Sequence, residues 1–178
     1  MVNEYFRVCL ESELSILVPL NYVVEAIVSN YREICPIPGV VPALLGVINH
    51  RGQLIWVLKL SDFLASTHLP LSSLFFLSSL QGITYSQQDL QWIFDKLDRV
   101  KKKKFLSEKL TLLIISADPT KIDAFDEINP KVACVVSQLQ GIVASDRARS
   151  NSDVDITDGF EAILEIRALF TALYSSYL

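Results

Sequence analysis

The chain has 178 residues, of which 51% are hydrophobic and 20% charged, and its formal net charge at pH 7 is −4. This length accommodates one domain or two small ones sharing a core, and the high apolar content excludes a mostly disordered chain. The negative charge argues against nucleic acid as the main partner, because phosphate binding requires a basic face.

Cysteine usage and hydropathy favour a cytoplasmic protein. Cys9, Cys35 and Cys134 are widely spaced among apolar residues, so we expect free, buried thiols in a reducing compartment. The first residues are charged and strand-like, unlike a signal peptide. No apolar span approaches the roughly 20 residues of a membrane helix, and we expect no membrane insertion.

The first part of the chain is predicted to be β-structure. Alternating apolar residues in Phe6–Leu10 and Ile16–Leu20 predict an antiparallel pair of strands. The β-branched stretch Asn21–Ser29 contains a single carboxylate, that of Glu25. Cys35–Pro42 carries three prolines and one glycine, so we expect an extended connector there.

A β-hairpin is predicted next, because the apolar runs Gly46–Asn49 and Leu54–Leu58 flank a polar turn. Gly52 supplies the positive φ that such a turn usually needs, and Arg51 is placed at the tip. We expect adjacent strands to bring Arg51 and Glu25 together. Two interpretations stay open: a surface ion pair worth ~0–1 kcal/mol, or an arginine oriented at a docking surface.

Residues 68–109 interrupt the β pattern. Apolar residues recur at helical spacing in Gln87–Phe105, which predicts an amphipathic helix. A basic run follows, consisting of Lys101, Lys102, Lys103 and Lys104. This run is either a solvated helix end, with cations near the negative end of the helix dipole, or a secondary patch that attracts an acidic partner or anionic lipid.

Strand character returns at Leu110–Ser116 and Lys131–Ser137. The C-terminal residues either form one amphipathic helix or begin with a strand, Ala162–Ile166, that leads into a helix from Arg167. About six short strands with proline-marked connectors favour small β-barrels over an α/β architecture.

Residue patterns of enzymes and metal sites are missing from the sequence. His50 and His68 are the two histidines, and neither has a neighbour at metal-ligand spacing. The chain contains no G-x-S-x-G motif and no glycine-rich phosphate-binding loop. We therefore expect no enzyme activity, no cofactor and no metal, and an enzyme built on a small barrel remains as an alternative without candidate residues.

Several segments together resemble the CheW-like domain, which couples chemoreceptors to the CheA histidine kinase in bacterial taxis. They are Glu4–Leu10, Ser15–Ser29, the Pro-Ile-Pro-Gly connector and above all Leu-Gly-Val-Ile-Asn-His-Arg-Gly-Gln-Leu-Ile-Trp-Val-Leu-Lys-Leu, residues 45–60. The pattern G-V-I-N-x-R-G followed by an apolar strand is specific. The likeness is looser over 110–145 and 162–173, and residues 68–109 exceed the usual connection. The tryptophan after the R-G turn and the Leu-Phe-x-x-Leu-Tyr tail resemble divergent cyanobacterial members tied to phototaxis or pilus-driven motility.

The resemblance implies a mainly β fold, with two small SH3-like five-stranded barrels sharing a core, a helical insertion and a C-terminal helix. We expect a single CheW-like domain over residues 1–178. Its first-barrel region is about 14–65 and its atypical basic insertion about 68–109. The remaining strands and the C-terminal helix lie in about 110–178.

The same resemblance implies a non-enzymatic adaptor between a chemoreceptor cytoplasmic tip and the regulatory domain of a CheA-type histidine kinase, without cofactor. The family's functional arginine and glutamate match Arg51 and Glu25, Gly52 completes the R-G turn, and the exposed aliphatic contacts carry over to Val24 and Ile27. Such a protein is cytoplasmic and recruited to receptor arrays. The alternative is a degenerate scaffold or sequestering protein that binds partners through the basic helix 87–106 without kinase coupling.

Overall fold

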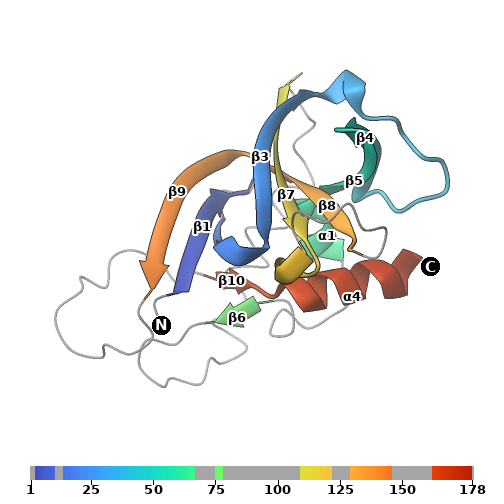
Figure 1. Ribbon diagram of the computed structural model, residues 1–178. Helices are drawn as coiled ribbons and strands as arrows, with labels where there is room; N and C mark the ends of the chain where they lie inside the picture. Colours follow the sequence, from blue (N-terminus) through green and yellow to red (C-terminus); the bar gives the residue numbers. More distant parts are fainter. Residues whose placement is uncertain are drawn as a thin grey trace, which may run out of the picture.

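The computed structural model describes residues 3–10, 14–66, 75–77, 109–121, 129–145 and 162–177, and these are mainly β-strands (Figure 1). The strands are β1 (Asn3–Cys9), β2 (Ser15–Pro19), β3 (Val23–Asn30), β4 (Leu44–His50), β5 (Gln53–Lys59), β6 (Phe75–Leu77), β7 (Lys109–Ser116), β8 (Lys131–Val136), β9 (Gln138–Ser145) and β10 (Ala162–Leu164). Helices α1 (Leu60–Ser66) and α4 (Ile166–Tyr177) and the 3₁₀ turns η1 (Leu20–Tyr22), η2 (Tyr31–Glu33) and η3 (Pro119–Lys121) complete the described structure.

The strands form two five-stranded sheets. Sheet A has the order β6-β10-β2-β1-β9, and sheet B has the order β3-β7-β8-β5-β4. Most pairs are antiparallel, including the predicted β1–β2 pair, but β10–β2 and β5–β8 are parallel. The predicted mainly β fold with two five-stranded units is confirmed. Strands from residues 14–65 divide between the sheets, with β2 in sheet A and β3, β4 and β5 in sheet B.

One extended segment belongs to both sheets, because only Ser137 separates β8 of sheet B from β9 of sheet A. The backbone N–H of Ser137 donates to the carbonyl of Cys9 at 2.9 Å, and its Oγ donates to the same oxygen at 2.8 Å. The sequence predicts the strand that ends here but not its continuation as β9.

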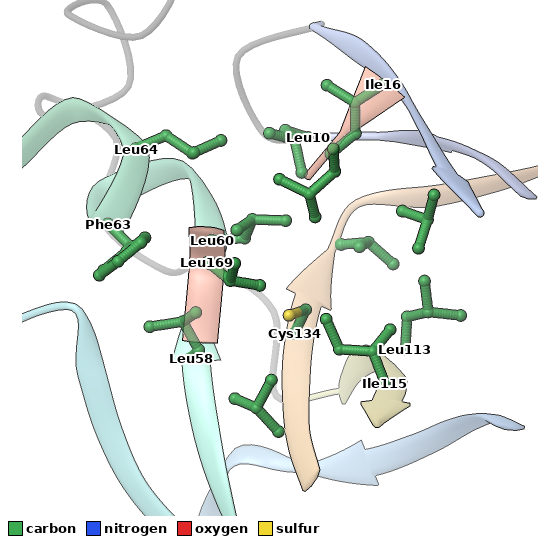
Figure 2. Close-up of a cluster of buried hydrophobic side chains, with 14 of the residues drawn as sticks. Leu10, Ile16, Leu58, Leu60, Phe63, Leu64, Leu113, Ile115, Cys134 and Leu169 are labelled. Carbon is green, nitrogen blue, oxygen red and sulfur yellow. The ribbon is translucent and has the colours of Figure 1, made fainter. Parts of the chain in front are cut away.

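The largest cluster of buried side chains lies between the two sheets and under the two helices, which confirms the predicted shared core. Figure 2 shows Leu60, Phe63 and Leu64 of α1 and Leu169 of α4 converging with side chains of both sheets. Alternate residues of β7 divide between two cores, since Leu113 joins this cluster and Leu112 joins the interior of sheet B. A strand buried on both faces has a continuous apolar sequence, as β7 does.

The C-terminal segment follows the second of the two predicted alternatives. Strand β10 pairs with β2 and β6, and α4 begins directly after it. Strand β6 lies inside the segment expected as a helical insertion and forms an edge of sheet A. The predicted helix 87–105, His68 and the lysines 101–104 lie outside the described residues. In the part of the chain that the structure describes, no helix has the length and apolarity needed to cross a membrane.

The three cysteines are free but differ in accessibility, which corrects the expectation that all are buried. Cys134 is buried in the shared core, Cys9 is half-buried and Cys35 is exposed. Burial raises the pKa of the Cys134 thiol to about 12, and a protonated thiol is a poor nucleophile.

We therefore expect a thiol reagent to modify Cys35 in the native protein and Cys134 only as the chain unfolds. Peptide mapping by mass spectrometry after timed labelling distinguishes the sites. In Cys35→Ser, the fast native modification disappears while the denaturant dependence of labelling at Cys134 is retained. Rapid modification of Cys134 without denaturant would contradict the buried environment.

Candidate functional site

The tip of the β4–β5 hairpin is a two-residue turn with positive φ at both central positions. The ladder ends at the pair His50–Gln53, and Arg51 and Gly52 between them have φ values of +52° and +81°. This is the pattern of a type I′ turn, in which Asn-Gly is preferred. The backbone N–H of Gly52 also donates to Oδ1 of Asn49 at 3.0 Å. Arg51 thus occupies a backbone conformation that costs a non-glycine residue about 1–2 kcal/mol.

The two expected charges meet at the point where sheet B closes on itself. Arg51 donates from Nη2 to Oε2 of Glu25 at 2.9 Å, and His50 Nε2 lies 2.6 Å from Oε1 of the same carboxylate. Strands β3 and β4 are the opposite edges of sheet B and not paired neighbours. The adjacency expected from the sequence is therefore made by side chains, across the seam of the barrel.

Exposure differs sharply among the three side chains of this cluster. Glu25 and His50 are 22% and 20% exposed, whereas Arg51 is 73% exposed. An ion pair with so accessible a partner adds only ~0–1 kcal/mol to stability. The arrangement instead holds a guanidinium by one nitrogen while most of its surface faces solvent. A fixed, planar, multidentate donor of this kind suits a carboxylate or an aromatic face on a partner.

His50 is the member of the cluster that sequence reasoning missed. The sequence presents it only as an imidazole base or a metal ligand, and the described residues contain no cluster suited to a metal ion. The sequence signal that could have predicted its role is its position as the last paired residue of β4 before the turn. A side chain there lies next to the tip residue and, in a closed barrel, faces the opposite edge of the sheet.

A second connection closes the seam farther from the hairpin tip, along the same free edge of β4. Cys35 and Val47 exchange two backbone hydrogen bonds of 2.8 and 2.9 Å, so the connector after β3 runs along the edge of β4. It passes directly over Gly46, where an added Cβ would overlap the carbonyl of Cys35. Gly46 has a φ of +140°. The base of the hairpin is thereby fixed against the connector that follows β3.

Glu33, a second carboxylate near this seam, has a purely local role. Its oxygens accept hydrogen bonds from Ser29 Oγ at 2.6 Å and from the side-chain amide and backbone N–H of Asn30. The Ser29 bond is the main cause that holds the pKa of Glu33 below its usual range. The carboxylate caps η2 and positions the start of the connector.

Aliphatic residues around the cluster divide into inward and outward sets. Val24 and Ile27, expected as contacts for a partner, are half-buried and pack against the interior cluster of sheet B. The exposed apolar side chains of these strands are Val28 at 69%, Leu54 at 73% and Trp56 at 40%. Trp56 lies beside Val47 across the hairpin. The expected lysine patch at 101–104 is outside the described residues.

Comparison with known proteins finds a matching family model and similar solved structures. A model of the CheW-like domain matches residues 4–76, which include the whole Glu25, His50 and Arg51 cluster. Curated proteins gave no match to the sequence. Among solved structures, the chain resembles the scaffolding protein TtCheW from Thermoanaerobacter tengcongensis, with 16% identity, a TM-score of 0.56 and coverage of 100% of this chain and 99% of that one. At this identity the likeness establishes the fold, and it confirms the expected architecture.

Proposed function

Because a model of the CheW-like domain matches residues 4–76 of this chain, we propose that the protein is a non-enzymatic adaptor of a taxis or pilus-motility pathway. It connects the cytoplasmic tip of a chemoreceptor to the regulatory domain of a CheA-type histidine kinase. The protein acts in the cytoplasm at receptor arrays and uses no cofactor. The family match and the shared fold support the scaffold role, and the geometry of the hairpin tip supports the docking site.

The observation that carries the proposal is the strained, exposed arginine held by a less exposed carboxylate. A stable hairpin does not require Arg51, since Asn would fit the positive φ at lower cost. The ion pair of Arg51 with Glu25 stabilises the fold by at most about 1 kcal/mol. This gain does not exceed the cost of the positive φ of Arg51. Unusual backbone conformations that stability does not explain are concentrated at functional sites.

Within this proposal each site residue has a distinct part. Arg51 is the donor presented to the partner, and Glu25 fixes its direction from across the seam. Gly52 provides the turn that lifts the guanidinium out of the sheet. Val24 and Ile27 contribute by packing the strand that carries Glu25 against the interior cluster of sheet B.

The test is calorimetric titration of the full chain with a receptor cytoplasmic fragment and with a CheA-type regulatory domain. Arg51→Asn removes the cation and relieves the turn, so it should leave stability within about 1 kcal/mol while weakening binding about tenfold or more. The matched control is Arg167→Gln, which removes another exposed arginine, on α4.

Two results would overturn the adaptor proposal. The first is that the wild-type chain binds neither fragment. The second is that Arg51→Asn and Glu25→Ala both bind like wild type while deletion of residues 87–106 abolishes binding. The second result would favour the degenerate scaffold that uses the basic helix.

A further inference from the structure

His50 makes the shorter of the two contacts to Glu25. Its Nε2 lies 2.6 Å from Oε1 of Glu25, while Arg51 donates to Oε2 of the same carboxylate at 2.9 Å. An ionised carboxylate accepts hydrogen bonds and donates none, so Nε2 carries the proton in this contact. His50 and Arg51 therefore bind different oxygens of one acceptor and do not compete for it.

The position of His50 restrains its ring more than the turn restrains the side chain of Arg51. His50 is the last paired residue of β4, whereas Arg51 lies outside the ladder. His50 follows Ile48 by two residues, and alternation along the strand places both side chains on the same face. Ile48 is buried in the interior cluster of sheet B, so the imidazole lies at the end of that interior. It is 20% exposed, against 73% for Arg51.

Glu25 alone is a weak support for the guanidinium. A glutamate side chain has three rotatable bonds, and ordering it costs conformational entropy that one exposed ion pair does not offset. The contact with His50 fixes Oε1 and leaves Oε2 to accept from Arg51 at the tip. Because the imidazole has only two rotatable bonds and a ladder-paired backbone, it restrains the carboxylate at a smaller cost in entropy.

We propose that His50 is a positioning residue, which holds Glu25 so that Arg51 is presented in one direction before a partner binds. The support then runs from the β4–β5 ladder through His50 and Glu25 to the guanidinium. A guanidinium that is oriented in advance loses less conformational entropy on binding, so affinity rises without any contact between His50 and the partner. The inference rests on the proposed docking role of Arg51 and adds the residue that preorganises it.

Two substitutions separate the hydrogen-bond donor of His50 from its bulk. His50→Leu removes the donor and keeps a side chain of similar size, whereas His50→Gln keeps an amide N–H that can donate to Glu25. In titration calorimetry with the receptor fragment and the regulatory domain, His50→Leu should weaken binding about three- to tenfold. His50→Gln should bind like wild type. In a Glu25→Ala background, His50→Leu should have no further effect, because the carboxylate through which His50 acts is gone.

The orientation of Arg51 is also measurable in the free chain. Relaxation of ¹⁵N at Nε of Arg51 should show restricted motion in wild type and in His50→Gln, and a lower order parameter in His50→Leu. Nε of Arg167, an exposed arginine on α4, should give the same order parameter in all three proteins. Unchanged backbone amide spectra of β7 and β8 show that each variant is folded.

Three results would overturn the positioning role. The first is that His50→Leu leaves unchanged either the order parameter of Arg51 or the affinity for a fragment that wild type binds. The second is an equal loss of affinity from His50→Leu in the Glu25→Ala background, which would mean that His50 contacts the partner directly. The third is that His50→Gln behaves like His50→Leu.

Failure of the adaptor proposal is distinguishable from failure of this inference. If the wild-type chain binds neither fragment, the adaptor proposal fails, and relaxation of Arg51 in the free chain then decides whether His50 positions it.

Discussion

Gly46→Ala should lower the free energy of unfolding by about 3 kcal/mol or more, although it adds one methyl group to an otherwise unchanged hairpin. The φ of +140° at this position costs a residue with a Cβ ~1–3 kcal/mol. The methyl group would also overlap the Cys35 carbonyl and force the connector away from β4. Two backbone hydrogen bonds between Cys35 and Val47 would be strained or lost, at roughly 0.5–1.5 kcal/mol each.

The control is Gly39→Ala in the same connector. Gly39 also has a positive φ, +83°, but an added Cβ meets nothing within 4 Å. The free energy of unfolding of that variant should fall only by the cost of a positive φ for a residue with a Cβ, about 1–2 kcal/mol. Urea denaturation monitored by tryptophan fluorescence compares the two. Equal stabilities of Gly46→Ala and Gly39→Ala would show that the contact over Gly46 does not restrain the connector.

The second large effect is expected from exchanging the charges of Glu25 and Arg51. Arg51→Glu sets two carboxylates against each other at the seam and removes the presented cation. We expect partner binding to weaken by about 30-fold or more, which corresponds to the ~2 kcal/mol typical of an interface arginine. Glu25→Arg alone should weaken binding less, because the cation at the tip remains but its direction is no longer fixed.

The double variant Glu25→Arg with Arg51→Glu separates docking from structure. It restores an ion pair across the seam, so stability should return most of the way to the wild-type value. Binding should not recover, because the tip now presents an anion. Titration calorimetry and denaturation on all four proteins give the two coupling energies. Recovery of binding in the double variant would mean that the pair matters only for the shape of the barrel.

The hairpin and its arginine were predictable because they depend on local chemistry. A polar turn with glycine between two apolar runs specifies a tight hairpin, and the tip residue then follows from counting along the chain. The positive φ of Arg51 itself was not anticipated, since arginine carries no preference for it. The meeting of Arg51 with Glu25 was expected from strand adjacency, although the structure achieves it across the closure of sheet B.

Features that depend on distant segments were not predictable. The contact of His50 with Glu25 requires the two edges of sheet B to meet, and no local pattern encodes barrel closure. Strand β9 was missed because Gly141 and the consecutive apolar residues after it interrupt the alternation that begins at Gln138. Strand β6 is too short for periodicity to detect. The parallel β5–β8 pairing joins segments more than seventy residues apart. No tight turn connects these strands, so no local sequence signal predicts that they pair.

The passage of one strand through both sheets at Ser137 has a mechanical consequence. Force applied to the hairpin tip enters β5 and is transferred along the ladder to β8. From β8 it continues through covalent bonds into β9, and from there into β1. The path contains no hinge or flexible linker. A displacement imposed on Arg51 should therefore reach β9 and β1 of sheet A through backbone and ladder hydrogen bonds.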